Sequence, residues 1–310
     1  MATPVLLLFS GQGAQAVGMA RELFDDFGVA RELAEGADEA LDFSLTQTMF
    51  AGPIEELTRT SRCQPALYLH GLMALAALRQ KAPDLQVVGA AGLSLGEFTA
   101  HAAAATFDFE TGLRVVAQRG LFMEEACEAT DGSMAAMIGG NEAAVRELAH
   151  EAGVDVANLN APGQIVLSGS QEGIAKAVAG AKGKGIKLAK ELTVAGAYHS
   201  RLMASAQSQL ASELSTVSLS APQFPVYCNV EASEVAEEGE IRDTLTRQVT
   251  GSVRWGESVA ALLDRFPGAI CLEMGPGKTL AGLLARIRKG APVYGCGTTE
   301  GIERALDACA

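Results

Sequence analysis

The chain has 310 residues, which is long enough for a large domain with a smaller one inserted into it. Hydrophobic residues make up 48% of it and charged residues 20%, as is typical of a folded globular protein. The formal net charge of −13 argues against nucleic acid as a partner, because a phosphate backbone requires a basic face.

The sequence shows neither a membrane segment nor a metal-binding pattern. No apolar run reaches the roughly 18 residues that cross a bilayer, and residues 1–9 enter a strand without a basic leader. Six cysteines occur singly, without a C-x-x-C pair or a nearby histidine: Cys63, Cys127, Cys228, Cys271, Cys296 and Cys309. We therefore expect a cytoplasmic protein with buried, reduced thiols, no membrane contact and no metal.

Strands and helices alternate along the first 130 residues, which predicts an α/β fold with a mostly parallel sheet. A strand over Val5–Phe9 is followed by a glycine loop and by a helix from about Gln15. Acidic amphipathic helices fill residues 17–42, and an apolar helix spans 64–80. A buried strand over 85–91 precedes a helix over 97–105, and a further helix spans 111–129.

Residues 131–196 have a different order of predicted strands and helices, which indicates an inserted subdomain. Strands are expected at 133–138, 154–158, 164–168 and 186–192, with helices at 141–152 and 171–182. This β-α-β-β-α-β order is ferredoxin-like. The main domain would then comprise 1–130 and 197–310, with a helix over 201–215 and strands at 226–229 and 269–273. The acidic stretch 231–243 is predicted to be an exposed loop that leads into a helix.

The segment Gly92-Leu93-Ser94-Leu95-Gly96-Glu97 lies between the strand at 85–91 and the following helix. A serine flanked by glycines at a strand-to-helix turn has its Oγ exposed, because the glycines leave room for a sharp bend. The helix N-terminus also directs N–H groups and a positive dipole end toward developing negative charge. We interpret Ser94 as a nucleophile.

Two other glycine loops resemble nucleotide-binding motifs without meeting their requirements. Gly11-Gln12-Gly13 follows a strand, but charged helix occupies the region where a dinucleotide fold needs its second strand. Gly277-Lys278-Thr279 resembles the end of a phosphate-binding loop, yet the first glycine of that motif would fall on Leu272, within a strand. We interpret residues 275–277 as a tight turn beside the site.

A serine nucleophile requires a base, and the chain has four histidines. His70 and His150 lie on predicted helices and are interpreted as structural. His101 lies two turns along the helix that follows Ser94 and cannot easily return to its Oγ. His199 remains, at the junction between the inserted subdomain and the main domain, where a cleft is expected to open.

Seven ordered motifs give the chain a specific resemblance. They are Phe9–Gln15, Gly92–Glu97, Gln118-Arg119-Gly120 with Met123, Asn160–Gln164, Gly196–Ser200, Gln248–Trp255 and Glu273–Lys278. Over essentially its full length, the chain resembles the malonyl-CoA:acyl carrier protein transacylases of fatty acid synthesis, relatives of polyketide synthase acyltransferase domains. The resemblance implies an α/β-hydrolase-like large domain with a ferredoxin-like insert.

The resemblance also implies the chemistry. Ser94 would attack the thioester of malonyl-CoA with His199 as base, and the acyl group would pass to the phosphopantetheine thiol of acyl carrier protein. The N–H groups of Leu95 and Gln12 would form the oxyanion hole, and the backbone carbonyl of Gln248 would orient His199. No cofactor is implied, because phosphopantetheine belongs to the carrier protein.

Three residues are candidates for substrate binding in addition to Gln12. Arg119 would hold the free carboxylate through a rigid pair of donors, which discriminates against uncharged acyl groups. Asn160 lies in the motif that resembles the family's asparagine loop. Tyr198 stands where malonyl-specific members carry Phe and methylmalonyl-specific domains usually carry Ser, so its bulk favours malonyl.

The expected partner is an acidic acyl carrier protein, and the enzyme is expected to be a monomer. Basic residues gather in two segments, one with Lys176, Lys182, Lys184, Lys187 and Lys190 and one with Arg286, Arg288 and Lys289. They can be interpreted either as a solvated face or as a docking patch near Lys182, Lys187, Lys190, Arg286 and Arg288.

Three residues depart from the family pattern. Leu93 replaces a histidine, Tyr198 replaces the more frequent Phe, and Ser10 replaces a proline. Three alternative functions stay open at this point. A serine hydrolase would share the turn at Ser94, and a non-catalytic docking module would share the fold; a polyketide acyltransferase with another dicarboxylic substrate would share the whole site.

Overall fold

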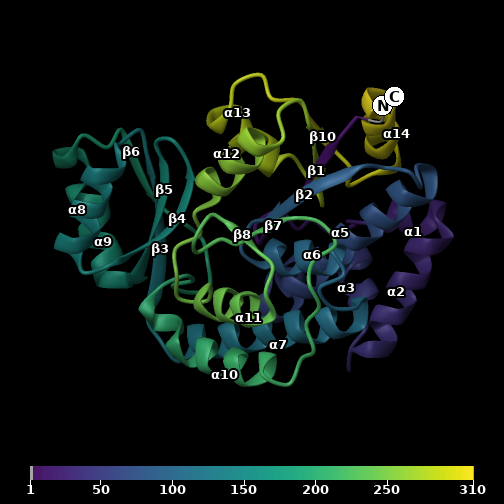
Figure 1. Cartoon of the computed structure of the whole chain (residues 1–310). Coiled ribbons are helices and arrows are strands. Elements are labelled where there is room, and N and C mark those ends of the chain that lie inside the picture. The colour runs from purple at the N-terminus through teal and green to yellow at the C-terminus, as the bar shows by residue number, and fades with distance from the viewer. Residues whose placement is uncertain (1–2, 310) are drawn as a thin grey trace.

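The computed structural model describes residues 3–309, whose strands form two separate sheets (Figure 1). The larger sheet has the strand order β10-β9-β1-β2-β7-β8. Its strands are β1 (Val5–Phe9), β2 (Val87–Gly92), β7 (Val226–Tyr227), β8 (Glu234–Val235), β9 (Ile270–Met274) and β10 (Val293–Gly295). All neighbours pair in parallel except β8, which is antiparallel to β7. The predicted α/β architecture is therefore confirmed.

Strand β1 lies between β2 and β9 and is buried on both faces. Val5, Leu7 and Phe9 belong to one hydrophobic core, and Leu6 and Leu8 belong to a second. Because successive side chains of a strand point to opposite faces, the unbroken apolar run of β1 separates the two cores.

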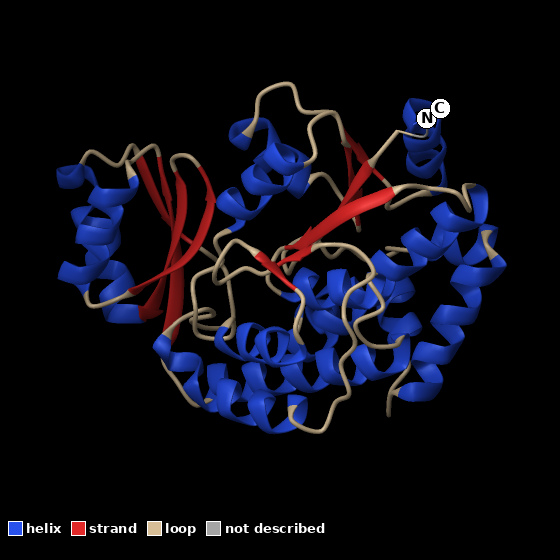
Figure 2. Ribbon diagram, viewed as in Figure 1, coloured by secondary structure: helices blue, strands red, loops and turns tan. Residues whose placement is uncertain are grey.

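Helices cover both faces of this sheet (Figure 2). The larger core contains residues of α1 (Arg21–Asp26), α2 (Gly28–Ala40), α3 (Leu45–Ala51), α4 (Ile54–Thr58), α5 (Thr60–Lys81), α6 (Leu95–Ala103), α7 (Phe109–Glu128), α10 (Ala204–Leu214), α11 (Glu238–Arg247) and α14 (Thr299–Cys309). The smaller core contains residues of α12 (Trp255–Arg265) and α13 (Thr279–Ile287). None of the helices within residues 3–309 combines the length and apolarity needed to cross a bilayer.

A second, four-stranded antiparallel sheet lies at the left of Figure 1 and has its own hydrophobic core. Its order is β4-β5-β3-β6, formed by β3 (Gly132–Ile138), β4 (Asp155–Ala161), β5 (Gln164–Ser170) and β6 (Leu188–Glu191). Helices α8 (Glu142–Ala152) and α9 (Gln171–Gly180) and the 3₁₀ turn η1 (Ala181–Lys184) pack on it. Backbone hydrogen bonds of Val253 with Ala157 and Leu159 join this body to the larger one.

Two predicted helix starts are wrong. The helix expected from about Gln15 begins at Arg21, because Gly13 and Gly18 have φ angles of 101° and 90° that hold the preceding segment in turns. The helix expected from Gln64 begins at Thr60, so Pro65 lies inside it. Proline commonly marks a first turn, and the sequence therefore placed this boundary too late.

Several elements were not predicted. They include α3, α4, α12, α14 and the short strands β8 and β10, while the helix expected over 201–215 begins as a 3₁₀ turn, η2 (Arg201–Met203). Strands of two or three residues carry no readable alternation, and they form because an existing sheet edge offers hydrogen-bond partners.

Candidate active site

Ser94 lies at a sharp turn between the end of β2 and the start of α6. Its backbone has φ 53° and ψ −109°, a conformation that residues with side chains rarely adopt. A Cβ on Gly92 would lie 1.8 Å from the carbonyl carbon of Gly96, and one on Gly96 would lie 2.3 Å from the carbonyl oxygen of Phe9. The bend therefore requires both glycines, as expected from the sequence.

His199 makes the contacts that a general base for Ser94 requires. Its Nε2 lies 2.8 Å from Ser94 Oγ, and its Nδ1 lies 2.8 Å from the carbonyl oxygen of Gln248. Because a carbonyl only accepts, the proton of the neutral ring resides on Nδ1, which leaves Nε2 to accept from the serine hydroxyl.

The surroundings of His199 keep the imidazole neutral. Burial and, to a smaller extent, the nearby charge of Arg119 lower the pKa of His199 to about 4, against the opposing effect of the Gln248 carbonyl. The ring is only 4% exposed. The base is therefore deprotonated at neutral pH and available to accept a proton.

The other histidines lie elsewhere. His70 Nε2 bonds to the carbonyl of Gly297 at 3.0 Å, and His101 Nδ1 lies 3.1 Å from Thr106 Oγ1. Both are buried, and burial lowers the pKa of His70 to about 4 and that of His101 to about 3. His150 lies exposed at the end of α8.

Arg119 is buried on α7 and directs its guanidinium at the nucleophile. Its Nη2 donates to Ser94 Oγ at 3.1 Å and to Gln248 Oε1 at 2.9 Å, and its Nη1 donates to Gln64 Oε1 at 2.5 Å. Burial lowers the pKa of Arg119 to about 10, so the group remains cationic at neutral pH. Its Nε is buried and has no hydrogen-bond partner among residues 3–309.

The two residues predicted to supply oxyanion donors are Leu95, within the turn, and Gln12, next to a glycine that packs on it. Leu95 is the first residue of α6, so its N–H has no acceptor within the helix. Gly11 packs directly on Leu93, since a Cβ there would lie 2.5 Å from the Leu93 carbonyl oxygen, and Leu93 N–H bonds to Phe9. The backbone that follows Gly11 therefore brings Gln12 beside the turn.

Tyr198 finds a partner for the hydroxyl group that distinguishes it from phenylalanine. The ring is 7% exposed, and its hydroxyl lies 2.5 Å from Thr60 Oγ1. Burial raises the pKa of Tyr198, and hydrogen bonds from Thr60 and the Gln12 side chain partly offset that rise. This phenol therefore stays neutral, and its position is set from two sides.

Asn160 is not hydrogen-bonded to the other candidates in the described part of the chain. It belongs to β4, is half-buried, and its Oδ1 is buried without a hydrogen-bond partner in the described part of the chain. No hydrogen bond within residues 3–309 joins it to Ser94, His199 or Arg119.

Three site residues were not predicted as functional. Gln64 binds Arg119, Asn229 binds the backbone of Ser94, and Glu97 accepts from Asn229 and Gln248. Only Asn229 carries a positional signal, because it follows β7 at the carboxyl edge of the sheet, where parallel strands collect functional residues.

The loop at 275–277 holds no phosphate-binding geometry. The Glu273 carboxylate accepts the N–H groups of Leu280 and Ala281, each at 2.9 Å, and so occupies the start of α13. A Cβ on Gly275 would lie 2.7 Å from Ser10 Oγ, so this turn packs against the loop that carries Gln12.

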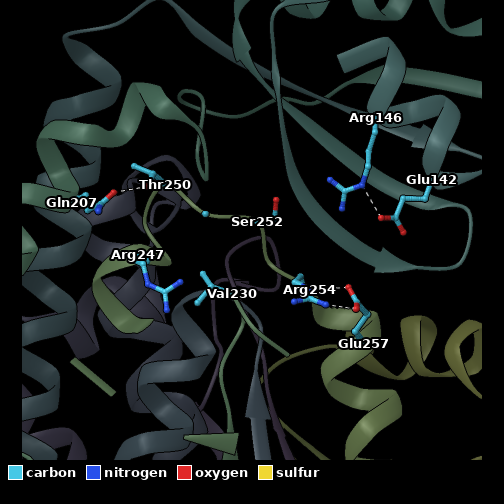
Figure 3. Close-up of a pocket in the computed structure, with 10 residues that line it drawn as sticks. Glu142, Arg146, Gln207, Val230, Arg247, Thr250, Ser252, Arg254 and Glu257 are labelled. Carbon is cyan, nitrogen blue, oxygen red and sulfur yellow. Dashed lines mark hydrogen bonds and ion pairs between the residues drawn. The ribbon is translucent and has the colours of Figure 1, made fainter. Parts of the chain in front are cut away.

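A separate groove lies beyond Gln248 and is lined by Thr250, Gly251 and Ser252, among other residues (Figure 3). Its arginines are paired: Arg146 with Glu142 at 2.8 Å and Arg254 with Glu257 at 2.5 Å. Neither Ser94, His199 nor Arg119 lines it, so the groove is separate from the chemistry.

Some of the basic residues are paired with acceptors in the protein, and the others are exposed. Lys176 donates to the Glu151 carbonyl and Lys184 pairs with Glu147 and Glu151, whereas Arg288 binds Asp264 at 2.6 Å. The remaining candidates for docking are exposed: Lys182, Lys187, Lys190 and Arg286.

Comparison with known proteins gives one consistent result. A family model described as "Acyl transferase domain" matches residues 6–281. The malonyl CoA-acyl carrier protein transacylase of Bacillus subtilis is 36% identical and covers 97% of this chain and 96% of its own length. The solved transacylase of the same name from Coxiella burnetii has a TM-score of 0.95 at 32% identity, covering 100% of this chain and 98% of its own.

A third match is a solved complex described as a type II polyketide synthase acyl-carrier protein with its malonyl-transacylase. It has a TM-score of 0.94 at 32% identity and covers 99% of this chain and 100% of the matched one. The chain therefore belongs to the acyl transferase family. Its predicted resemblance to the malonyl-CoA:acyl carrier protein transacylases within that family is confirmed.

The low pKa of His199 predicts an unusual pH profile for Ser94. The rate at which a neutral sulfonyl fluoride modifies Ser94 in the free protein should stay level from about pH 8 to about pH 5 and decline only near pH 4. Intact mass measured over time gives the rate, and circular dichroism verifies folding at each pH. An acid limb near the usual histidine value of about 6.5 would contradict a buried neutral base.

Proposed function

We propose that the protein is a malonyltransferase of fatty acid biosynthesis that moves malonyl from malonyl-CoA to the phosphopantetheine thiol of acyl carrier protein. The observation that carries the proposal is the position of Ser94 Oγ, which lies within hydrogen-bond distance of a neutral base and a buried guanidinium. A hydrolase needs the first contact, and only an enzyme for anionic acyl groups needs the second.

In the first half-reaction, Ser94 Oγ attacks the thioester carbonyl while its proton passes to His199 Nε2. The CoA sulfur leaves and takes that proton, and a malonyl-serine ester remains. The carrier thiol then gives its proton to His199 and attacks the ester, and Ser94 Oγ regains a proton. Protons and acyl groups balance over the cycle without a cofactor.

The tetrahedral oxyanion of each half-reaction is assigned to the N–H groups of Leu95 and Gln12. The N–H of Ser94 is not available, because it donates to Asn229 Oδ1 at 2.8 Å. One such donor typically contributes about 3 kcal/mol to transition-state stabilisation. The carbonyl of Gln248 replaces the acid of a catalytic triad as the group that orients His199.

Arg119 is assigned as the site of the malonyl carboxylate. In the described chain its two Nη atoms contact uncharged oxygens, so a carboxylate would be its first anionic hydrogen-bond partner. Such charge-assisted bonds are roughly twice as strong as neutral ones. We assign Tyr198, held by Thr60, as the wall that excludes an α-methyl group, and Asn160, with its unpartnered Oδ1, to the outer part of the substrate.

The architecture supports a division of the chain into a main domain and an inserted subdomain. We propose that residues 1–130 and 197–310 form an α/β-hydrolase-like catalytic domain and that residues 131–196 form a ferredoxin-like subdomain. The β-α-β-β-α-β order and the separate core of the second body support this division. The six free cysteines in the described residues support a reducing compartment such as the cytoplasm.

We propose that an acidic carrier protein docks at β6 and α13, both of which lie in the upper part of Figure 1. Lys187 and Lys190 are exposed there on either side of Leu188, which is 52% exposed. A basic surface with an apolar centre suits an acidic helical partner. One relative is named a malonyl CoA-acyl carrier protein transacylase and another is a malonyl-transacylase in complex with a type II polyketide carrier, and loading of malonyl is the step common to both.

The first test is covalent loading. Incubation with malonyl-CoA should increase the intact mass by one malonyl group, and Ser94→Ala should abolish this increase because it removes the hydroxyl that is hydrogen-bonded to His199 Nε2. Ser200→Ala, which removes a buried hydroxyl bonded to the Ala197 carbonyl, serves as the control and should still load. Absence of the adduct in the wild-type protein, or its survival in Ser94→Ala, would refute the mechanism.

The second test concerns the carboxylate. Arg119→Ala should lower malonyl loading by about 100-fold relative to acetyl loading, since about 3 kcal/mol of charge-assisted bonding is lost. Arg114→Ala, on the exposed face of the same helix, should leave the ratio unchanged. An unchanged malonyl-to-acetyl ratio in Arg119→Ala would remove the assignment.

The third test concerns docking. Combined replacement of Lys182, Lys187 and Lys190 by Glu should raise KM for the carrier protein about tenfold at low salt, without changing the rate of loading from CoA. Lys81→Glu, outside the patch, is the charge control. Equal carrier kinetics in the triple variant and the wild-type protein would identify these lysines as a solvated face.

A further inference from the structure

Asn229 binds two backbone groups of the segment that leads into Ser94. Its side chain is fully buried. Its Oδ1 accepts the N–H of Ser94 at 2.8 Å, and its Nδ2 donates to the carbonyl of Gly92, also at 2.8 Å. A single side-chain amide therefore fixes two successive peptide groups, Gly92–Leu93 and Leu93–Ser94.

We propose that Asn229 is a positioning residue that holds Ser94 in its reactive conformation, and that Glu97 anchors Asn229. The inference rests on the proposed acyl-transfer function and extends it to residues that do not touch the substrate. Ser94 needs such support because its φ of 53° lies in a region that favours glycine.

Glu97 is hydrogen-bonded to both Asn229 and Gln248. Its Oε2 accepts from the backbone N–H of Asn229 at 2.9 Å and from Gln248 Nε2 at 2.6 Å. Gln248 Nε2 also donates to the carbonyl of Ser94 at 3.0 Å. One buried carboxylate thus joins the chain after β7, the helix after the nucleophile and the loop that orients His199.

The hydrogen bonds also fix which way the Gln248 amide points. Arg119 Nη2 can only donate, so the amide atom that it contacts must be Oε1, and Nε2 must face Glu97 and Ser94. The nucleophile, the base and the guanidinium are therefore positioned by one connected network. Within it the Asn229 side chain bonds to the backbone of Gly92 and Ser94, and its Oδ1 also lies 3.4 Å from Gln248 Nε2.

Asn229→Ala removes both bonds to the turn and should slow modification of Ser94. At saturating malonyl-CoA the loading rate should fall about 10- to 100-fold with KM changed by less than about threefold, as expected for a misplaced nucleophile. Rates are expressed per folded molecule, with the folded fraction taken from circular dichroism. A purely structural role would lower the folded fraction and leave this rate unchanged.

Asn229→Asp supplies the conservative variant and a pH signature. A neutral carboxyl group can accept from Ser94 N–H and donate to the Gly92 carbonyl, whereas an ionised one cannot donate. The ratio of variant to wild-type rate should therefore rise as pH falls from about 8 to about 5. The titratable groups around this position are Glu97, Arg119, His199 and Cys228, and they are present in both proteins.

Ser258→Ala is the matched control. Ser258 is fully buried on α12, and its Oγ bonds to the carbonyls of Arg254 and Cys228, next to Asn229, without contacting the turn. It should lose stability and keep the wild-type rate per folded molecule.

Each rate is measured twice, once with malonyl-CoA and once with a neutral sulfonyl fluoride, which needs only a positioned Ser94. If the wild-type protein takes up no malonyl group, the proposed function fails, and the sulfonylation rates still decide the inference. An unchanged rate per folded molecule in Asn229→Ala, or a pH-independent ratio in Asn229→Asp, would overturn the role of Asn229.

Discussion

The buried guanidinium of Arg119 imposes the constraint on which the rest of the site depends. A cation that is 1% exposed must be surrounded by acceptors, and here they come from α5, the turn at Ser94 and the loop at Gln248. Bringing Gln248 to the guanidinium also brings its carbonyl to His199. The requirement of one buried charge therefore sets the geometry of the base.

Close backbone packing explains why the turn at Ser94 lies against the carboxyl ends of β1 and β2. β1 and β2 end side by side, and glycines at 11, 92 and 96 let the backbone segments approach closely there. Side chains at those positions would separate the turn from the loop that carries Gln12. Close backbone packing thus produces the sharp turn at Ser94 and holds the loop that follows β1 against it.

The sequence alone predicted those features that depend on the local spacing of residues. The glycine-serine turn and the alternation of strands and helices are local, and the elimination of three histidines needed only their positions. Gln64, Asn229 and Glu97 act through partners 55, 135 and 151 residues away, respectively, and such contacts leave no periodic pattern. Helix boundaries at Arg21 and Thr60 were misplaced for a related reason, because tertiary packing overrode the local turn signals.

The hydroxyl pair between Tyr198 and Thr60 has a consequence for how the substrate range could evolve. A phenylalanine at this position would lack that hydrogen bond and would be held by packing alone. Tyr198 is instead tied to the first turn of a 22-residue buried helix. A smaller side chain at 198 alone would leave the buried Thr60 hydroxyl without its partner, so a wider pocket requires coordinated change at both positions.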